Sequence, residues 1–322
     1  MSGPRVAVAM GGASLEREIS LRSGHRVERA LRELGFEVHG LDVDARFIER
    51  LLAVKPSLVF VAMHGRGGED GTLQELLEIL ALPYTGSDAL SSALCMDKLL
   101  FKRMLVQHGI PTPSFHSLSE AALREMGGAG TFATILDELH LPVVVKPVAQ
   151  GSAIGIKFVH EIEQLPGAIL GAFGYGDRVL IEERVVGREL AVTVLDTGGS
   201  SSQRVALPVV ELLTPEGFYS YEAHYTIGGV RLKVPAELER GLEEKVKQVA
   251  LDSCELMGCR DFARVDMILD EEGTPKVLEM NTIPGLTETG ITPAAAEAAG
   301  ISFTQLVDAI VTRARREAEG EA

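Results

Sequence analysis

Cysteines and long hydrophobic runs are both scarce in this sequence. Cys95, Cys254 and Cys259 are the only cysteines among 322 residues, and neither their odd number nor their spacing indicates a disulfide framework or a metal site. A reducing compartment, the cytosol, is therefore expected. The longest apolar segments, such as SLVFVAM and LPVVV, are too short to span a bilayer, and the first residues, MSGPRVAVAMGG, contain no signal-peptide core. These features predict a soluble cytoplasmic protein.

Positive charge is also scarce. The chain has 31 lysines and arginines against 46 acidic residues, a net charge of −15, which argues against nucleic acid or an anionic membrane as partner. The net charge does not exclude anionic substrates, because a few local lysines and arginines can hold phosphate. The apolar content of 46% and mean hydropathy of +0.15 are typical of a globular protein, and the length allows two or three domains.

The N-terminal part alternates strands with helices. Strands are predicted at 5–10, 37–42 and 57–63, and helices at 16–34 and 47–54. This alternation indicates a parallel sheet, whose ligands lie beyond the carboxyl ends of the strands. Polar groups follow those ends: Gly11-Gly12 with Ser14 and Glu16, His64-Gly65, and the loop 67–71. Gly11-Gly12 could instead form a tight turn, Glu16 could be a helix N-terminal carboxylate, and His64 could be a satisfied loop histidine.

A glycine-rich segment indicates phosphate binding. PVAQGSAIG joins predicted strands 141–146 and 156–160, and such a hairpin can close backbone N–H groups over phosphates, although a plain β-hairpin is the alternative. Lys146 at its base and Lys98, on a predicted helix 96–109, supply two cations. A glycine-rich loop is predicted at 126–131.

The next strand, 178–183, carries carboxylates suited to a nucleoside. Glu182 would meet a purine and Glu189 the ribose hydroxyls, although surface carboxylates fit the spacing equally well. Strands are predicted at 189–195 and 205–212, a lid at 213–229, and helices at 235–257 and 303–316.

A hairpin with predicted strands 262–269 and 276–280 carries the clearest candidate metal site. Closing its turn between residues 270 and 275 sets Asp266 opposite Glu279, and strand alternation places Asn281 and Arg264 nearby. Carboxylate and amide oxygens suit magnesium when phosphates complete the shell. A solvated hairpin is the alternative, but unpartnered charges inside apolar strands are costly, so the metal is favoured.

Together these segments resemble the ATP-grasp D-alanine–D-alanine ligases over essentially the whole chain. The motifs that carry the resemblance are EREIS, HGRGGEDGTLQ, MDK, VVKPVAQGSAIG, IEERVVGRE, YEAHY, ARVD and LEMNTIPG. The resemblance implies an α/β fold that is α+β in its ATP-binding half. It also implies three domains: 1–93, a parallel-sheet domain on the side of the first D-alanine; 94–184, with the glycine-rich flap; and 185–322, with the lid and the magnesium site.

The resemblance also implies site residues and partners. Glu16 would bind the first D-alanine's ammonium, Arg264 and the Gly285 N–H the tetrahedral oxyanion, and His64 would lie near the acyl phosphate. Ser152 and Tyr225, linked with Glu16, would order the lid. The residues implied for ATP are Lys98, Lys146, Ser152, Glu182, Glu183, the Val185 backbone, Glu189 and His224. Asp266, Glu279 and Asn281 would hold two Mg²⁺ ions, with Mn²⁺ as an alternative, and the family implies a homodimer that takes ATP and D-alanine.

The sequence departs from the family pattern at three positions. His224 stands where the family usually has lysine, Ala153 where a second serine is common, and Gly290 where a serine receives the second substrate's carboxylate. Acceptor specificity for D-lactate or D-serine therefore remains an alternative to D-alanine, although Tyr225 favours an amine acceptor. A regulator without catalysis is disfavoured because Arg264 and the three metal candidates are present. An ATP-grasp enzyme for a larger substrate would not explain EREIS or HGRGGEDG.

Overall fold

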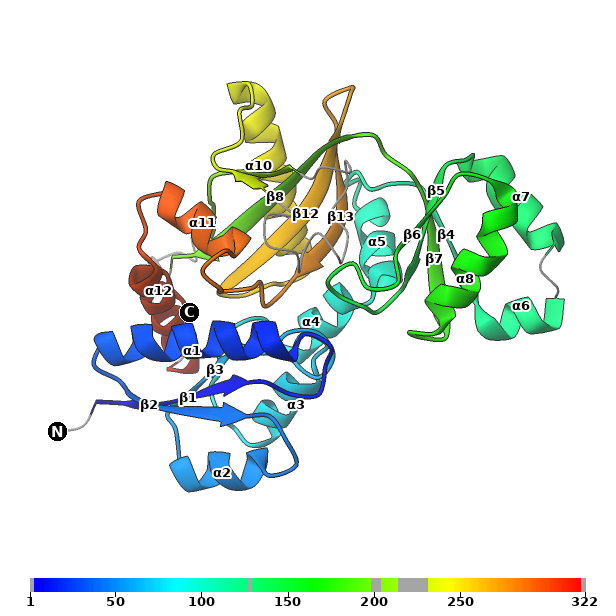
Figure 1. The fold of residues 1–322 in the computed structure, drawn as a ribbon. Helices are drawn as coiled ribbons and strands as arrows, with labels where there is room; N and C mark the ends of the chain where they lie inside the picture. Colours follow the sequence, from blue (N-terminus) through cyan, green and yellow to red (C-terminus); the bar gives the residue numbers. More distant parts are fainter. Residues whose placement is uncertain (1–2, 127–128, 198–203, 214–230, 320–322) are drawn as a thin grey trace.

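The computed structural model describes residues 3–126, 129–197, 204–213 and 231–319. These residues form three β-sheets, which follow one another along the chain (Figure 1).

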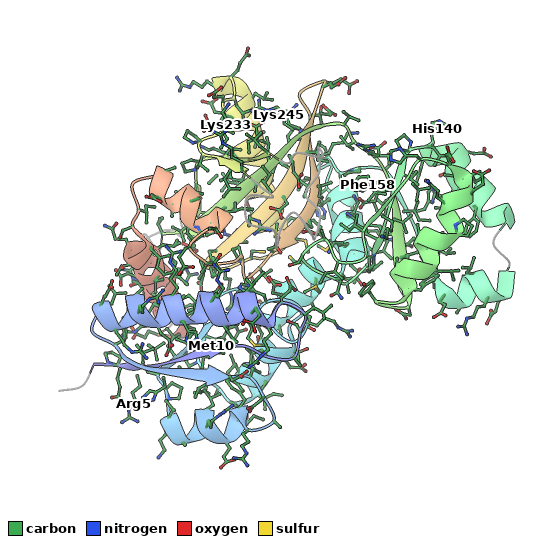
Figure 2. The ribbon with its side chains drawn as sticks, viewed as in Figure 1. Arg5, Met10, His140, Phe158, Lys233 and Lys245 are labelled. Atoms are coloured by element: carbon green, nitrogen blue, oxygen red, sulfur yellow. The ribbon has the colours of Figure 1, made fainter. Side chains whose placement is uncertain are left out.

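The N-terminal sheet is parallel, in the order β2-β1-β3. Its strands and helices are β1 (Arg5–Met10), α1 (Arg17–Glu33), β2 (Glu37–Asp42), α2 (Phe47–Val54), β3 (Leu58–Val61) and α3 (Thr72–Ile79). Alternate β1 side chains enter two cores, one with α1 and one with α2 and α3. Met10 packs beneath α1 (Figure 2). Every β1 residue after Arg5 is buried, as expected for a central parallel strand.

The central sheet is antiparallel, in the order β4-β7-β5-β6. Its elements are β4 (Phe115–Ser119), α6 (Glu120–Met126), α7 (Ala129–Leu139), β5 (Val143–Pro147), β6 (Lys157–Val159), the 3₁₀ helix η1 (Ile162–Gln164), α8 (Leu165–Phe173) and β7 (Arg178–Glu183). Helices α7 and α8 contribute side chains to a core with β5 and β7. This core is separate from those of the other two sheets.

The C-terminal sheet has the order β11-β10-β8-β12-β13, with β9 paired to β8. Its strands are β8 (Gly187–Asp196), β9 (Arg204–Ala206), β10 (Val210–Leu213), β11 (Arg231–Lys233), β12 (Phe262–Asp270) and β13 (Pro275–Asn281), and its helices are α10 (Arg240–Leu256), α11 (Ile291–Ala298) and α12 (Phe303–Ala318). Helix α12 packs on α1, and Val27 and Leu31 share one core with Leu306 and Ile310. The N- and C-terminal parts are therefore held together by apolar packing.

Two helices connect these parts. They are α4 (Ala89–Met96) and α5 (Lys98–Gln107). Cys95, Phe101 and Leu105 lie in the core of the C-terminal sheet, so this start of the predicted central domain packs on β12 and β13. The boundaries at 93/94 and 184/185 remain predictions, with each sheet built from strands of one predicted domain.

The predicted bounds of β1, β2 and α2 are confirmed, whereas two other predictions are wrong. The predicted loop 126–131 lies mostly in helices, because α7 begins at Ala129 and buries Ile135 and Leu139. The predicted strand 205–212 is two strands, β9 and β10, because Pro208 between them has no N–H to donate to a ladder. Strands β4 and β11 and helices α3, α4, α6, α7, α8 and α11 were not predicted.

Among the described residues, no single helix is long and apolar enough to cross a membrane. Only the bent pair α11 and α12, taken together across an angle of 103°, meets the length and composition requirement.

Candidate functional site

The β12–β13 hairpin sets the geometry of the site. Asp266 pairs with Glu279 and Arg264 with Asn281, which confirms the predicted arrangement. The predicted turn closure is wrong by one residue, because Leu269 rather than residue 270 lies opposite Pro275. A β-bulge beside Asp266 corrects the offset, so the polar side chains still meet on one face.

Each carboxylate of this hairpin already has a cationic partner. Arg264 donates from Nε and Nη2 to the two oxygens of Asp266, both at 2.7 Å, and Asn281 Nδ2 donates to Asp266 Oδ2 at 3.1 Å. Lys98 Nζ lies 3.1 Å from Glu279 Oε2 and donates to the Gln150 carbonyl at 2.6 Å. Burial raises the pKa of Asp266 despite Arg264, whereas Lys98 and Lys146 outweigh burial and lower the pKa of Glu279.

This donor set fits magnesium when a nucleotide shares the shell. It offers two carboxylates on adjacent strands and one amide, all oxygen donors from rigid β structure. Among the described residues no group of three His, Cys, Asp or Glu side chains forms a complete metal cage. Phosphate oxygens would therefore have to supply the remaining ligands.

Glu16 lies where the N-terminal and central parts meet. It precedes α1, and the Ser152 hydroxyl of the glycine-rich hairpin donates to its Oε1. Ser152 and Ala153 have φ of +50° and +56°, a left-handed backbone that is strained for residues with a Cβ. Burial raises the pKa of Glu16, although Ser152 and the nearby Lys98 and Arg264 oppose the shift. The predicted contact between Glu16 and Ser152 is thus present.

His64 contacts the segment after the hairpin. Its Nδ1 lies 3.0 Å from the Ile283 carbonyl, and its Nε2 lies 3.1 Å from Ser23 Oγ. A carbonyl can only accept, so Nδ1 donates and Nε2 accepts from the Ser23 hydroxyl. The plainer interpretation of His64 as a satisfied histidine thus describes its contacts, and its predicted place near an acyl phosphate remains a prediction.

The predicted adenine residue Glu182 is buried between two lysines. Its Oε1 lies 2.8 Å from Lys102 Nζ and its Oε2 lies 2.7 Å from Lys146 Nζ. Glu183, beside it, pairs with Lys276 at 2.8 Å. Glu189, on β8, is a half-buried carboxyl whose pKa is raised to about 8 by burial and by the charges of Asp266 and Glu279. Glu182 itself is an interior group, so the surface-carboxylate alternative is wrong for it.

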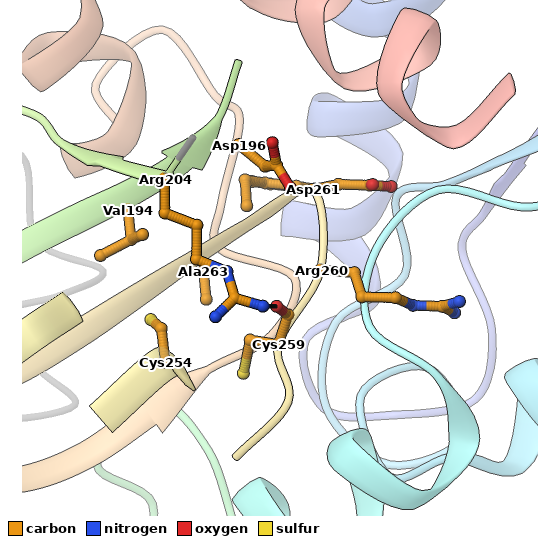
Figure 3. A pocket seen from close by; sticks show the side chains of 9 residues that line it. Val194, Asp196, Arg204, Cys254, Cys259, Arg260, Asp261 and Ala263 are labelled. Carbon is orange, nitrogen blue, oxygen red and sulfur yellow. Dashed lines mark hydrogen bonds between the residues drawn. The ribbon is translucent and has the colours of Figure 1, made fainter. Parts of the chain in front are cut away.

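Two cavities lie near strands β12 and β13 among the described residues. One is lined by Lys98, Gly151, Glu279 and Asn281, together with Glu69 and Thr282, and so belongs to the predicted site. The other contains none of the predicted site residues. Its lining includes Asp196, Arg204, Cys259 and Asp261 (Figure 3), and it lies beside Ala263, which alternates with Arg264 along the strand.

Known proteins identify the family. The family model described as "D-ala D-ala ligase C-terminus" matches residues 104–312, and the model described as "D-ala D-ala ligase N-terminus" matches residues 46–87. The chain belongs to the D-alanine–D-alanine ligase family. The family and the ATP-grasp fold class predicted from the sequence are therefore confirmed, and the protein is a ligase.

Individual members are similar over nearly their whole length. The D-alanine–D-alanine ligase of Moorella thermoacetica is 44% identical over 307 residues, which cover 95% of this chain and 98% of that protein. The solved D-alanine–D-alanine ligase of Bacillus anthracis complexed with ATP has a TM-score of 0.84 at 30% identity, covering 99% and 100% of the two chains. A D-Ala:D-Ser ligase from Enterococcus faecalis has a TM-score of 0.81 at 28% identity, covering 97% and 99%.

In this ligase, the loop after the hairpin leaves no space for a side chain at position 290. A Cβ on Gly290 would stand 2.8 Å from the Gly285 carbonyl oxygen and 3.1 Å from that of Thr287. A Cβ on Gly285 would meet no described atom within 4 Å. His224, Tyr225 and the predicted lid beyond Leu213 lie outside the described residues, and contacts of Val185 with a nucleotide stay a prediction.

Several buried polar residues of this ligase site were missed from the sequence. Glu69 accepts a hydrogen bond from the Gly65 N–H at 2.6 Å. Burial and the charge of Glu16 raise the pKa of Glu69, and the charge of Arg264 opposes this shift. Glu69 belongs to HGRGGEDG, so the motif held the signal. Lys102 follows Lys98 by one helical turn, which places both on one face of α5.

Proposed function

We propose that this ligase joins two molecules of D-alanine, using ATP, to make D-alanyl-D-alanine for peptidoglycan precursor synthesis in the cytoplasm. The observation that carries the proposal is the convergence at one site of Glu16 with Ser152, Lys98 with Glu279, and Arg264 with Asp266 and Asn281. These residues come from three separate parts of the chain. The similarity to D-alanine–D-alanine ligases over 95% or more of the chain supports the same substrates.

The reaction needs cations to bring two anions together. In the first step a D-alanine carboxylate oxygen attacks the γ-phosphorus of ATP, and the bond to the β,γ-bridging oxygen breaks to release ADP. Lys98 and Lys146 would neutralise the phosphates during this transfer. Glu16 would hold the ammonium of this first D-alanine.

The second step forms the peptide bond. The amine of a second D-alanine attacks the acyl phosphate carbonyl, and the tetrahedral intermediate expels inorganic phosphate while the amine loses a proton. Arg264 and the Gly285 N–H would stabilise the oxyanion of that intermediate. Ser152, held against Glu16, would fix the hairpin over the reacting groups and limit hydrolysis of the acyl phosphate.

Magnesium would be held by Asp266, Glu279 and Asn281, where it would neutralise phosphate charge. In the structure Arg264 pairs with Asp266 and Lys98 pairs with Glu279. These are two of the three cations proposed for the reacting groups and both of the carboxylates proposed for the metal. Binding of metal and phosphate would exchange one set of ion pairs for another without leaving a buried charge unpaired.

The decisive experiment measures phosphate release with ATP and Mg²⁺, and identifies products by mass. Incubations contain no amino acid, D-alanine, L-alanine, or D-alanine with D-serine or D-lactate. Release that requires D-alanine and yields the dipeptide is expected. A mixed product would establish the second candidate, a ligase with another acceptor, which Gly290 and the similarity to a D-Ala:D-Ser ligase favour. No stimulation by any of them would refute both.

Two tests address the metal and the assembly. Glu279→Gln should weaken Mg²⁺-dependent ATP binding measured by calorimetry, and unchanged metal dependence would remove Glu279 from the proposed ligands. A homodimer is proposed, and sedimentation would detect it.

A further inference from the structure

Helix α1 carries three arginines whose side chains contact the loop 285–290, and of these only Arg26 donates hydrogen bonds to the loop backbone. Arg26 Nη1 donates to the carbonyls of Leu286 and Thr287, at 3.1 and 2.7 Å. Arg22 and Arg29 only approach the exposed Glu288 carboxylate, at 3.5 and 3.4 Å.

The Arg26 side chain is fixed on its other side as well. Its guanidinium carbon lies 3.7 Å from the centroid of the Phe303 ring, at the start of α12. Both hydrogen bonds come from the single nitrogen Nη1, while the guanidinium plane stacks on the aromatic face, a contact that a lysine ammonium makes only as a point charge. The side chain therefore ties α1, α12 and the loop together.

The carbonyl that Arg26 holds is the one next to position 290. Thr287 O accepts from Arg26 at 2.7 Å and from the Gly290 N–H at 3.1 Å, and it is 3.1 Å from where a Cβ on Gly290 would stand. The neighbouring Leu286 N–H donates to Ser23 Oγ at 3.2 Å. Two residues of α1 thus fix three backbone groups between Gly285 and Gly290.

We propose that Arg26 is a positioning residue for the acceptor site, holding the loop 285–290 in the conformation that receives the second substrate. The inference rests on the proposed function, because the family resemblance assigns the acceptor carboxylate to position 290, where this chain has no hydroxyl. With no side chain there, the hydroxyls of Thr287 and Thr289 or the backbone amides of the loop would receive the acceptor, and Arg26 sets the placement of this loop.

The test separates the two half-reactions. Hydroxylamine attacks the acyl phosphate and expels phosphate, so the hydroxamate of D-alanine reports the first step and the dipeptide reports the second. Arg26→Met keeps the aliphatic stem over Phe303 but removes the donors. We expect its ratio of hydroxamate to dipeptide to rise about tenfold, as for a small misplacement of a reactant, while the KM for ATP stays unchanged. Arg26→Lys, whose ammonium can donate to both carbonyls but lacks the guanidinium plane, should recover part of the loss.

Arg29→Met is the matched control, because it removes the same charge from the same helix. The variant loses only the ion pair with Glu288, in which the Arg29 side chain is 65% exposed and the Glu288 side chain 54% exposed. Its ratio should stay at the value of the unaltered protein. An unchanged ratio in Arg26→Met, or an equal rise in both variants, overturns the proposal.

Hydrogen exchange tests the positioning role of Arg26 independently of whether the proposed function is correct. The amides of residues 285–292 should exchange faster in Arg26→Met than in Arg29→Met. If the unaltered protein made neither product from D-alanine, the proposed function would be wrong, and equal exchange in the two variants would overturn the positioning role as well.

Discussion

The buried ion pairs around Glu182 give the sharpest prediction about stability. Lys102 is fully buried and Lys102, Glu182 and Lys146 form a chain of two contacts, 2.8 and 2.7 Å long. Burial lowers the pKa of Lys102 to about 8, whereas Lys102 and Lys146 outweigh burial and lower the pKa of Glu182. Glu182 has two cations and Lys102 has one anion, so the glutamate keeps its charge more readily than the lysine does.

Lys102→Met should therefore raise the free energy of unfolding at pH 7, by up to about 3 kcal/mol, because it removes a protonated lysine that burial disfavours. Removing one partner of a buried ion pair costs about 3–5 kcal/mol when the other charge is left alone. Glu182 would keep Lys146 at 2.7 Å, so this cost does not arise. Lys146 would then be the only cation on Glu182 and less available to phosphate, so the KM for ATP should rise more than kcat falls.

The pH dependence provides an independent check. The unfolded chain keeps the Lys102 proton until about pH 10.5, whereas the folded protein releases it near pH 8. Between these values the unfolded state binds more protons, so the contribution of Lys102 to stability rises with pH, by at most about 3 kcal/mol. Lys102→Met removes this rise.

Denaturant unfolding at pH 7, 8 and 10 measures both effects. Lys247→Met, which breaks a partly exposed ion pair with Glu243, is the control and should change stability by less than about 0.5 kcal/mol. A Lys102→Met protein with unaltered stability at pH 7, and the same rise toward pH 10 as the unaltered protein, would refute the reasoning.

Three further predictions follow from other sites. Arg264→Ala should abolish turnover while calorimetry still detects ATP binding; near-normal dipeptide synthesis would remove Arg264 from the transition state. Gly290→Ser should lower stability by about 1–3 kcal/mol and slow dipeptide formation, since its Cβ would meet the Gly285 and Thr287 carbonyls; a faster enzyme would show that the loop can give way. Burial raises the pKa of Asp261 to about 7, so the folded state keeps a proton that the unfolded chain loses near pH 4. The stability that this proton contributes is lost as pH rises through 7. Asp261→Asn should flatten the dependence of stability on pH between pH 4 and 8, and an unchanged slope would contradict this assignment.

Local patterns predicted much of this fold. The bounds of β1, β2 and α2 follow from apolar periodicity and short polar turns, which act over neighbouring residues. The pairing of Asp266 with Glu279 followed from the hairpin connection, although the bulge that preserves it depends on how β13 packs. Strands β9 and β10 were predicted as one strand because the apolar residues on the two sides of Pro208 form one continuous segment of sequence.

The motif resemblance predicted the family and brought Glu16, Ser152, Arg264 and the hairpin ligands into one site. The resemblance did not predict which groups these side chains would contact. Nothing near Glu182 in the sequence indicates that Lys102 would share its carboxylate, and nothing near Arg26 indicates the Leu286 and Thr287 carbonyls, 260 residues further along the chain. The sequence by itself determined the chemical groups and those strands and helices whose apolar periodicity is clear, because these depend on residues close together in the chain. Only the tertiary structure decided which charges are paired and what fixes the loop 285–290, because those contacts arise when separate segments pack and exclude water from between them.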